Sequence, residues 1–287
     1  MTNGKTDVAA RMELIATIFN QSMSIAIDEK NFARLSQHLN KVENEFRSVA
    51  YEGASMSIAL DDLEKSNALK RWFEFLNGIG KMHASQVHVG LGWALAKKKI
   101  DPENILENIH PLLQLKVIDG CGYYDGIFRQ RFSIAGKSIP EEINSFMIHG
   151  YDQGIGRAIY YQCKGELEKI PDVISGFTEA RHADIWRGTG MAFLYVGGWN
   201  ETKPDELFSL AGNNCNQLYA SIALIASSRA DANAITSYVE TACKKWCNCS
   251  VSTLTETARN AAIETVSHNG SYLDWLGKLT KKFATNF

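Results

Sequence analysis

Apolar residues recur at intervals of three and four along much of the chain, which is the period at which side chains share one face of an α-helix. Alternation of β-branched residues, which would indicate strands, persists nowhere. The pattern therefore predicts an all-α protein. The clearest helical periods cover Val8–Ser24, Asn31–Val49, Asn67–Phe75, Asp231–Cys247 and Thr253–Val266.

Prolines and short polar motifs predict where the helices begin and end. The five prolines separate segments of helical length, so each is expected to mark a connection. Residues 101–103 (Asp-Pro-Glu) and the Ser-x-x-Glu box at 138–141 are typical of helix starts. The stretch 197–200 (Gly-Gly-Trp-Asn) is the best candidate for a break in the second half of the chain.

Five segments repeat a motif in which small residues alternate. Successive leading glycines lie 37, 30, 34 and 34 residues apart, which is the period of a two-helix repeat. These glycines are Gly53, Gly90, Gly120, Gly154 and Gly188.

Alternating small residues lie on two opposite flanks of a helix, because positions i and i+2 point in roughly opposite directions. Neighbouring helices can then approach closely on both sides, as they do in stacked helical hairpins. Glycine inside a helix costs about 0.5–1 kcal/mol relative to alanine, so either close packing offsets this cost or some glycines form turns. Residues 119–122 (Asp-Gly-Cys-Gly) are the best candidate for such a turn.

The predicted architecture is a helical-hairpin repeat, as a solenoid or α/α toroid, with an irregular helical bundle as the alternative. One domain is expected over residues 1–287. Within it, residues 1–47 form N-terminal helices, 48–200 form the glycine-motif core, and 201–287 form a C-terminal helical cap.

Charge and cysteine content restrict the classes of partner. The chain has 30 Lys+Arg against 32 Asp+Glu, so no global field favours nucleic acid or an anionic membrane. Its best apolar run, residues 221–227, is too short to span a bilayer, and no signal peptide is evident, so we expect a cytoplasmic protein. The six cysteines are expected to be reduced, and the C-x3-C-x-C cluster at 243–249 is more typical of packed thiols than of a zinc site.

The polar residues at or just before the glycine motifs are the leading site candidates: Glu52, His88, Asp119, Asp152 and Arg187. If the motif helices line one concave surface, these side chains converge on a common cavity. The alternative interpretation is that the two aspartates cap turns or helix starts and that Glu52 and Arg187 form an ordinary ion pair.

A carboxylate desolvated by aromatic neighbours has a raised pKa and can act as a general acid or base, for example by protonating an olefin. Aromatic rings around it could face a developing cation, as a cyclase requires. The predicted catalytic carboxylates are Glu52, Asp119, Asp125 and Asp152. The predicted substrate-binding residues are His88, Trp93, Tyr123, Tyr124, Arg157, Tyr160, Trp186, Arg187 and Tyr195.

Two Glu-x-x-His pairs, at 107–110 and 179–182, match the ligand spacing of di-iron helices. The first is weakened because His110 precedes Pro111, which disfavours helix there. The chain has no phosphate-binding glycine loop and no nucleophile elbow, so nucleotide and Ser-His-Asp chemistry have no support. No cofactor and no metal are predicted.

Five stretches together resemble the domain of unknown function 1702 family, which includes the UnbL-type proteins encoded beside enediyne polyketide synthases. They are residues 51–56, 86–96, 119–128, 151–157 and 180–190, the last followed by 195–198. The resemblance implies an accessory or tailoring protein of secondary metabolism that acts on an apolar polyketide- or isoprenoid-like intermediate, with a biosynthetic protein as a further partner. A cyclase- or isomerase-like enzyme is the leading expectation. The alternatives are a non-catalytic helical-repeat interaction module and a di-iron oxidase.

Overall fold

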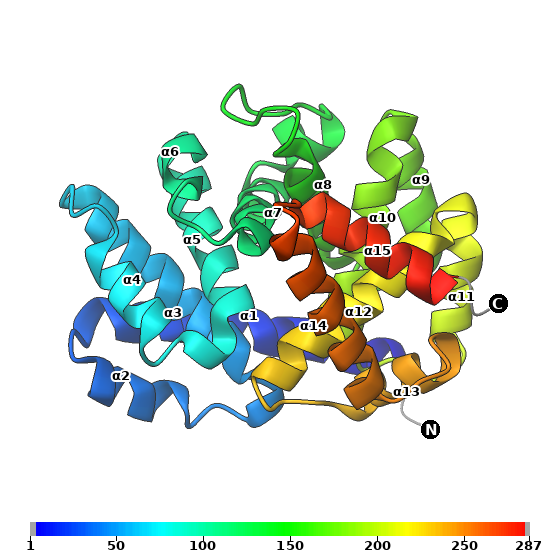
Figure 1. Cartoon of the computed structure of the whole chain (residues 1–287), viewed down its shortest axis with the longest axis horizontal. Coiled ribbons are helices and arrows are strands. Elements are labelled where there is room, and N and C mark those ends of the chain that lie inside the picture. Colours follow the sequence, from blue (N-terminus) through cyan, green and yellow to red (C-terminus); the bar gives the residue numbers. More distant parts are fainter. Residues whose placement is uncertain (1–3, 285–287) are drawn as a thin grey trace.

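The computed structural model describes the backbone of residues 4–284 and the side chains of residues 8–282 (Figure 1). This part of the chain folds into fifteen α-helices, three short 3₁₀ segments and one π-helical segment, and it contains no strand. The prediction of an all-α protein is confirmed.

Seven long helices pack against one another in chain order. They are α1 (Gly4–Asp28), α3 (Asn44–Glu64), α5 (Ala84–Lys98), α7 (Pro111–Phe128), α8 (Ile148–Gln162), α10 (Glu179–Val196) and α12 (Cys215–Asp231). Helix α1 also contacts α10, so the two ends of the succession from α1 to α10 meet. One continuous hydrophobic core, from Val8 to Leu279, lies between these helices.

Shorter helices connect the long ones or cover them. The connecting helices are α2 (Phe32–Leu39), α4 (Lys70–Asn77), α6 (Glu103–Leu106), α9 (Ile170–Ser175) and α11 (Lys203–Ala211). The C-terminal helices α13 (Ser237–Trp246), α14 (Val251–Ser267) and α15 (Tyr272–Ala284) pack on α12, and α15 also reaches α7 (Figure 1).

Neighbouring long helices run parallel. Contacts between α1 and α3 keep a constant offset of 34 residues, as the pairs Arg11–Glu45, Phe19–Gly53 and Met23–Ser57 show. Between α7 and α8 the contacts also advance together, through Leu115–Gly150, Asp119–Gly154 and Gly126–Ala158. Each connection must therefore return the chain to the starting end before the next long helix begins.

The glycine motifs bring the backbones of these helices together. In α5, α7, α8 and α10 the first glycine of the motif faces the preceding helix and the second faces the following one. A Cβ atom on Gly92 would lie 1.9 Å from the Val117 carbonyl oxygen, and one on Gly188 would lie 1.8 Å from that of Gln153. Only glycine permits this approach. The predicted close packing on two flanks is present, while the solenoid or toroid assignment stays a prediction.

One predicted turn is wrong for the same reason. Residues 119–122 lie inside α7. Gly120 packs on the Val89 carbonyl of α5, and Gly122 packs on the Tyr151 carbonyl of α8. These glycines allow close contact between helices and do not change the direction of the chain.

Several predicted boundaries need correction. The stretch Asn31–Val49 is divided by a turn at residues 40–43, and Asp231–Cys247 is divided by a turn in which Asn233 has a left-handed φ of 51°. The period continues through both turns because apolar residues on each side pack into the same core. Helix α4 begins only at Lys70, since Ala68 and Leu69 also have positive φ.

Other start and stop signals had mixed outcomes. The Ser-x-x-Glu box at 138–141 begins no helix, because α8 starts only at Ile148. By contrast, prolines lie in the first turn of α7, α9 and α11. The break at 197–200 is confirmed, with Gly197 and Gly198 both at positive φ.

The proposed division of the domain stays a prediction. Residue 48 lies within α3, whereas residue 200 lies between α10 and α11. The six cysteines are free thiols, and four of them are buried. Among the described helices, none combines the length and the hydropathy that crossing a bilayer requires.

Candidate functional site

A cavity of about 140 Å³ lies between six long helices, α1, α3, α5, α7, α8 and α10, each of which contributes side chains to its wall. Five of the residues predicted from the sequence line it together: Glu52, Trp93, Tyr123, Arg157 and Tyr195. Side chains from five different helices, each at least 30 positions from the next in the sequence, thus share one wall: Phe19, Glu52, Trp93, Tyr123 and Arg157.

The wall of the cavity is largely aromatic. The Trp93 ring lies 4.9 Å from that of Phe19 and 4.8 Å from that of Tyr123, measured between centroids. Phe128, at the end of α7, is 64 % exposed, and Ala16 and Asn20 of α1 are exposed as well. These three residues mark the mouth of the cavity, and the polar groups lie deeper.

The cavity-lining residues share a phase relative to the leading glycines. A residue directly before a glycine and the residues three and seven positions after it lie on one helix face, because they are four apart. This rule places Glu52, Trp93, Tyr123 and Arg157 on the cavity side, and it extends to Ile127, Tyr161 and Tyr195 one turn later. Gln153, directly before Gly154, belongs to the same face.

Glu52 is the titratable group at the centre of the site. It is only 4 % exposed, and burial raises its pKa to about 7, with the negative charge of Asp119 acting in the same direction. Arg157 and the indole N–H of Trp93 lower the pKa and offset part of the rise. Protonated and ionised Glu52 therefore coexist near neutral pH, which is the condition for general acid or base chemistry.

Arg157 is a fixed cation beside Glu52. Its Nη1 donates to Asp119 Oδ1 at 2.7 Å, and the guanidinium lies 4.2 Å from the Tyr123 ring centroid. Burial opposes the charge of Arg157, but the carboxylates of Asp119 and Glu52 outweigh burial and raise its pKa. Arg157 therefore stays charged, paired on one side and stacked on the other.

A buried network holds Asp119 in place. Gln153 Nε2 donates to Asp119 Oδ2 at 2.5 Å, and Arg187 Nε donates to Gln153 Oε1 at 2.8 Å. Arg187 also pairs with Asp184, whose carboxylate accepts a hydrogen bond from His149 Nδ1 at 2.7 Å. The capping and ion-pair interpretation of Asp119 and Arg187 is therefore wrong, because Asp119 lies inside α7 and Arg187 bonds residues other than Glu52.

Two buried polar atoms belong to side chains of the cavity wall. Trp93 Nε1 and the Tyr195 hydroxyl make no hydrogen bond of normal geometry with any described residue. Trp93 Nε1 nevertheless lies close enough to the Glu52 carboxylate to lower its pKa, and Ser48 lies close enough to the Tyr195 hydroxyl to offset part of the rise in its pKa that burial causes. Glu52 and Ser48 therefore lie beside these two groups.

Two predicted polar residues, His88 and Asp152, lie elsewhere. His88 Nδ1 is 2.6 Å from the Ala84 carbonyl, its ring packs edge-on against Trp72 of α4, and burial lowers its pKa to about 4. His88 and Asp152 stand one position earlier than the cavity phase, about 100° round the helix. Asp152 accordingly faces away and accepts two hydrogen bonds from Arg181, at 2.8 and 2.5 Å.

Asp125 also lies outside the cavity. It accepts a hydrogen bond from the Tyr151 hydroxyl at 2.9 Å and one from Arg129 at 3.1 Å. Burial raises the pKa of Asp125, but its hydrogen-bond partners lie where α7 packs against α8. Asp125 therefore has a packing environment rather than a place in the cavity.

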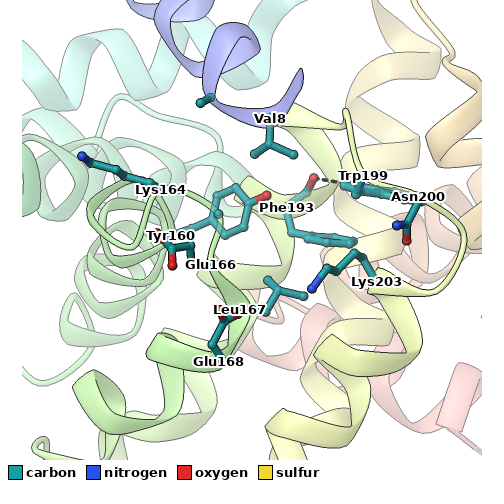
Figure 2. Close-up of a pocket in the computed structure, with 12 residues that line it drawn as sticks. Val8, Tyr160, Lys164, Glu166, Leu167, Glu168, Phe193, Trp199, Asn200 and Lys203 are labelled. Atoms are coloured by element: carbon teal, nitrogen blue, oxygen red, sulfur yellow. Dashed lines mark hydrogen bonds between the residues drawn. The ribbon is translucent and has the colours of Figure 1, made fainter. Parts of the chain in front are cut away.

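The remaining aromatic candidates do not line the central cavity. Tyr124 packs against Phe128 outside the mouth, at 4.9 Å between centroids, and Trp186 is buried in the core. Tyr160 lines a separate pocket of about 370 Å³, where Phe193 and Trp199 stack at 4.8 Å (Figure 2). Figure 2 shows charged side chains such as Lys164 and Lys203 around this second pocket, in contrast to the aromatic wall of the cavity.

Sequence reasoning missed several residues of the site. Phe19 belongs to α1, which carries no glycine motif, although the 34-residue period back from Gly53 reaches it. Tyr161 fits the seven-residue phase described above. Lys116, one turn before Asp119, is buried, and burial lowers its pKa to about 8; no sequence pattern marked it.

The described residues contain no group of three or more His, Cys, Asp or Glu side chains placed to hold a metal ion. Glu107 and His110 do not share a helix, since His110 is the N-cap of α7. His182 bonds the Phe177 carbonyl. The two pairs with di-iron spacing therefore do not assemble a ligand set in this part of the chain.

A comparison with known protein families shows to which family the chain belongs. The family described as "Protein of unknown function (DUF1702)" matches residues 1–283. The chain belongs to the DUF1702 family. No curated protein and no solved structure matches it. The family extends beyond the glycine motifs to α1 and to the C-terminal helices, so this DUF1702 protein is matched over all six helices that line the cavity.

Proposed function

We propose that this DUF1702 protein binds an apolar small molecule in the central cavity and that Glu52 gives it acid–base chemistry. The observation that carries the proposal is the convergence of Glu52, Trp93, Tyr123, Arg157 and Tyr195 from five helices on one cavity. An apolar pocket with a few converging polar groups and a perturbed carboxyl group is the usual form of a ligand site.

The chemistry suits a neutral substrate that gains positive charge during reaction. Protonated Glu52 can donate a proton, and the faces of Trp93, Tyr123 and Tyr195 can stabilise the resulting cation. The fixed pair of Arg157 and Asp119 keeps the deeper part of the site close to neutral. Cyclisation or isomerisation of an olefinic substrate is the reaction class that these groups serve best.

The biological setting belongs to the same proposal. The resemblance of the glycine-motif segments to UnbL-type proteins supports a role in secondary-metabolite biosynthesis, as an accessory or tailoring enzyme on a polyketide- or isoprenoid-like intermediate. The cytoplasm is the compartment that we expect for it.

Deletion of the gene, followed by metabolite profiling of the producing strain, tests this function directly. The expected result is loss of a product and accumulation of its less cyclised or isomeric precursor. A gene encoding Glu52→Gln should fail to restore the product. The matched control is Glu256→Gln, which changes an exposed glutamate of α14 and should restore it. An unchanged metabolite profile, or full restoration by Glu52→Gln, would contradict the proposal.

A further inference from the structure

The wall of the central cavity changes from buried to exposed side chains. Val49 and Glu52 of α3 are 3 % and 4 % exposed, and Tyr195 of α10 is buried as well. Ala16 of α1 and Phe128 of α7 line the same cavity and are exposed to solvent. The cavity therefore has a buried end, where Glu52 lies, and a mouth at the surface.

The volume of the cavity limits how much of a ligand it can enclose. Its volume of about 140 Å³ is similar to the ~150 Å³ apolar cavity that holds one benzene ring in another protein. A segment of about six carbon atoms therefore fills it. Sites that enclose a whole drug-sized molecule have volumes of about 300–1,000 Å³. A ligand of that size would lie only partly inside this cavity.

Aromatic side chains continue from the cavity onto the surface of the protein. The Phe128 ring lies 5.9 Å from that of Trp93 inside the cavity and 4.9 Å from that of Tyr124 outside the mouth, measured between centroids. Phe128 is 64 % exposed, and exposure of apolar surface to water is unfavourable. A ligand that ended inside the cavity would leave this ring in water, whereas one that leaves through the mouth would cover it.

We propose that the cavity binds a linear hydrocarbon end first, with a terminal segment of about six carbons inside and the remainder leaving through the mouth across Phe128. This inference rests on the proposed function, because it names the substrate class of that same cavity. The olefin that Glu52 can reach then belongs to the terminal segment. Phe128 is a specificity-determining residue, because it contacts only ligands that are longer than the cavity.

Alkyl glucosides from butyl to decyl are suitable probes, because the sugar is too large to follow the alkyl group into a cavity of this volume. Isothermal titration calorimetry against the full-length protein, below the critical micelle concentration, gives their affinities. Inside the cavity each added methylene leaves water completely and should tighten binding by about fourfold. Beyond about six carbons the alkyl group has Phe128 on one side and water on the other, so each methylene should add only about twofold. A plot of log affinity against the number of carbons should therefore bend near six carbons.

Two variants should change different parts of this plot. Phe128→Ala removes the apolar surface outside the mouth, so the gain in affinity from hexyl to decyl glucoside should fall from about sixteenfold to about fourfold or less, while butyl glucoside binds as before. Val49→Phe places four further carbon atoms at the buried end and should remove the steep part of the plot. Val251→Phe makes the same substitution at the start of α14, away from the cavity, and should leave the plot unchanged.

The outcomes separate this inference from the proposed function. A constant gain per methylene up to decyl glucoside, a bend that stays in place in Val49→Phe, or an equal loss at all lengths in Phe128→Ala overturns end-first binding. Absence of binding by every glucoside, to protein with an unchanged circular dichroism spectrum, overturns it too. The acid–base role of Glu52 is tested separately by the metabolite profile of Glu52→Gln. A bent plot together with full restoration by Glu52→Gln would support end-first binding and contradict the proposed chemistry.

Discussion

Replacing Gly188 by alanine tests whether helix contact at the glycine motifs holds the fold together. The new Cβ would lie 1.8 Å from the Gln153 carbonyl oxygen, whereas ordinary contacts begin at 3.4 Å. The backbones of α8 and α10 would therefore have to separate by about 1.6 Å at this point, which is the difference between these two distances. A gap of 0.5–1 Å already forfeits a quarter to a half of each van der Waals contact. Because α8 and α10 pack along their lengths, we expect a loss of about 3 kcal/mol or more in the free energy of unfolding.

Gly277→Ala is the matched control for this change. Gly277 also lies inside a helix, α15, but nothing approaches its Cβ position within 4 Å. Alanine there should stabilise the protein by about 0.5–1 kcal/mol, because glycine is the poorer helix former. Urea unfolding followed by circular dichroism at 222 nm measures both variants. A Gly188→Ala variant within about 0.5 kcal/mol of the wild type, on the scale that surface substitutions reach, would refute the reasoning.

Three further predictions concern buried charge and burial itself. Glu52 has a pKa of about 7 in the folded protein against a usual value of 4.5, so its contribution to stability is present below about pH 4.5 and is lost as the pH rises towards 7. Urea unfolding should therefore show Glu52→Gln gaining about 2–3 kcal/mol on the wild type between pH 5 and pH 8; a constant difference would contradict the raised pKa. Asp119→Ala should cost about 3–5 kcal/mol in the same assay because it leaves Arg157 buried and unpaired, whereas Asp231→Ala, which breaks an exposed ion pair of the same 2.7 Å length, should cost less than about 1 kcal/mol. Similar losses in the free energy of unfolding for Asp119→Ala and Asp231→Ala would refute the effect ascribed to burial. In native protein a thiol reagent should modify the half-buried Cys215 and Cys249 well before Cys243 and Cys247, because burial raises the thiol pKa of the latter two. Mass spectrometry of the labelled peptides gives the order of modification. Equal rates of labelling at all four thiols would contradict the packing of these side chains.

The fold class and the two-sided contact could be predicted because each leaves a mark on a single helix. Apolar residues at helical intervals mark the buried face, and alternate glycines at positions such as Gly120 and Gly122 mark two flanks of close approach. The error at residues 119–122 came from treating glycine as a turn former, although the repeat already provided a packing reason. Interruptions such as Asn233 were missed because a single left-handed residue does not disturb the period.

The candidate site was partly predictable for a reason of phase. Glu52 and Asp119 directly precede a glycine, and Trp93 and Arg157 follow one by three residues, so all four face the same way. Asp152 was grouped with them although it stands one position earlier, and the 100° rotation carries it to Arg181 instead. The contribution of α1 could not be predicted from the motif, because its contact uses the backbone of Phe19 rather than a glycine.

The parallel course of the long helices has an electrostatic consequence for the mouth of the cavity. The C-terminal end of an α-helix carries roughly half a negative charge, because its last carbonyl groups have no partner within the helix. Phe128 is the final residue of α7, and Tyr161 and Tyr195 are the last but one of α8 and α10, so three such ends meet at the cavity. Arg11 and Arg229 donate hydrogen bonds to the final carbonyls of α10, which offsets that end. The last carbonyls of α7 accept from the neutral side chains of Gln130 and Gln162, and those of α8 accept from backbone N–H groups. Neutral donors leave more of the negative potential at these two ends, where it would favour a substrate that gains positive charge.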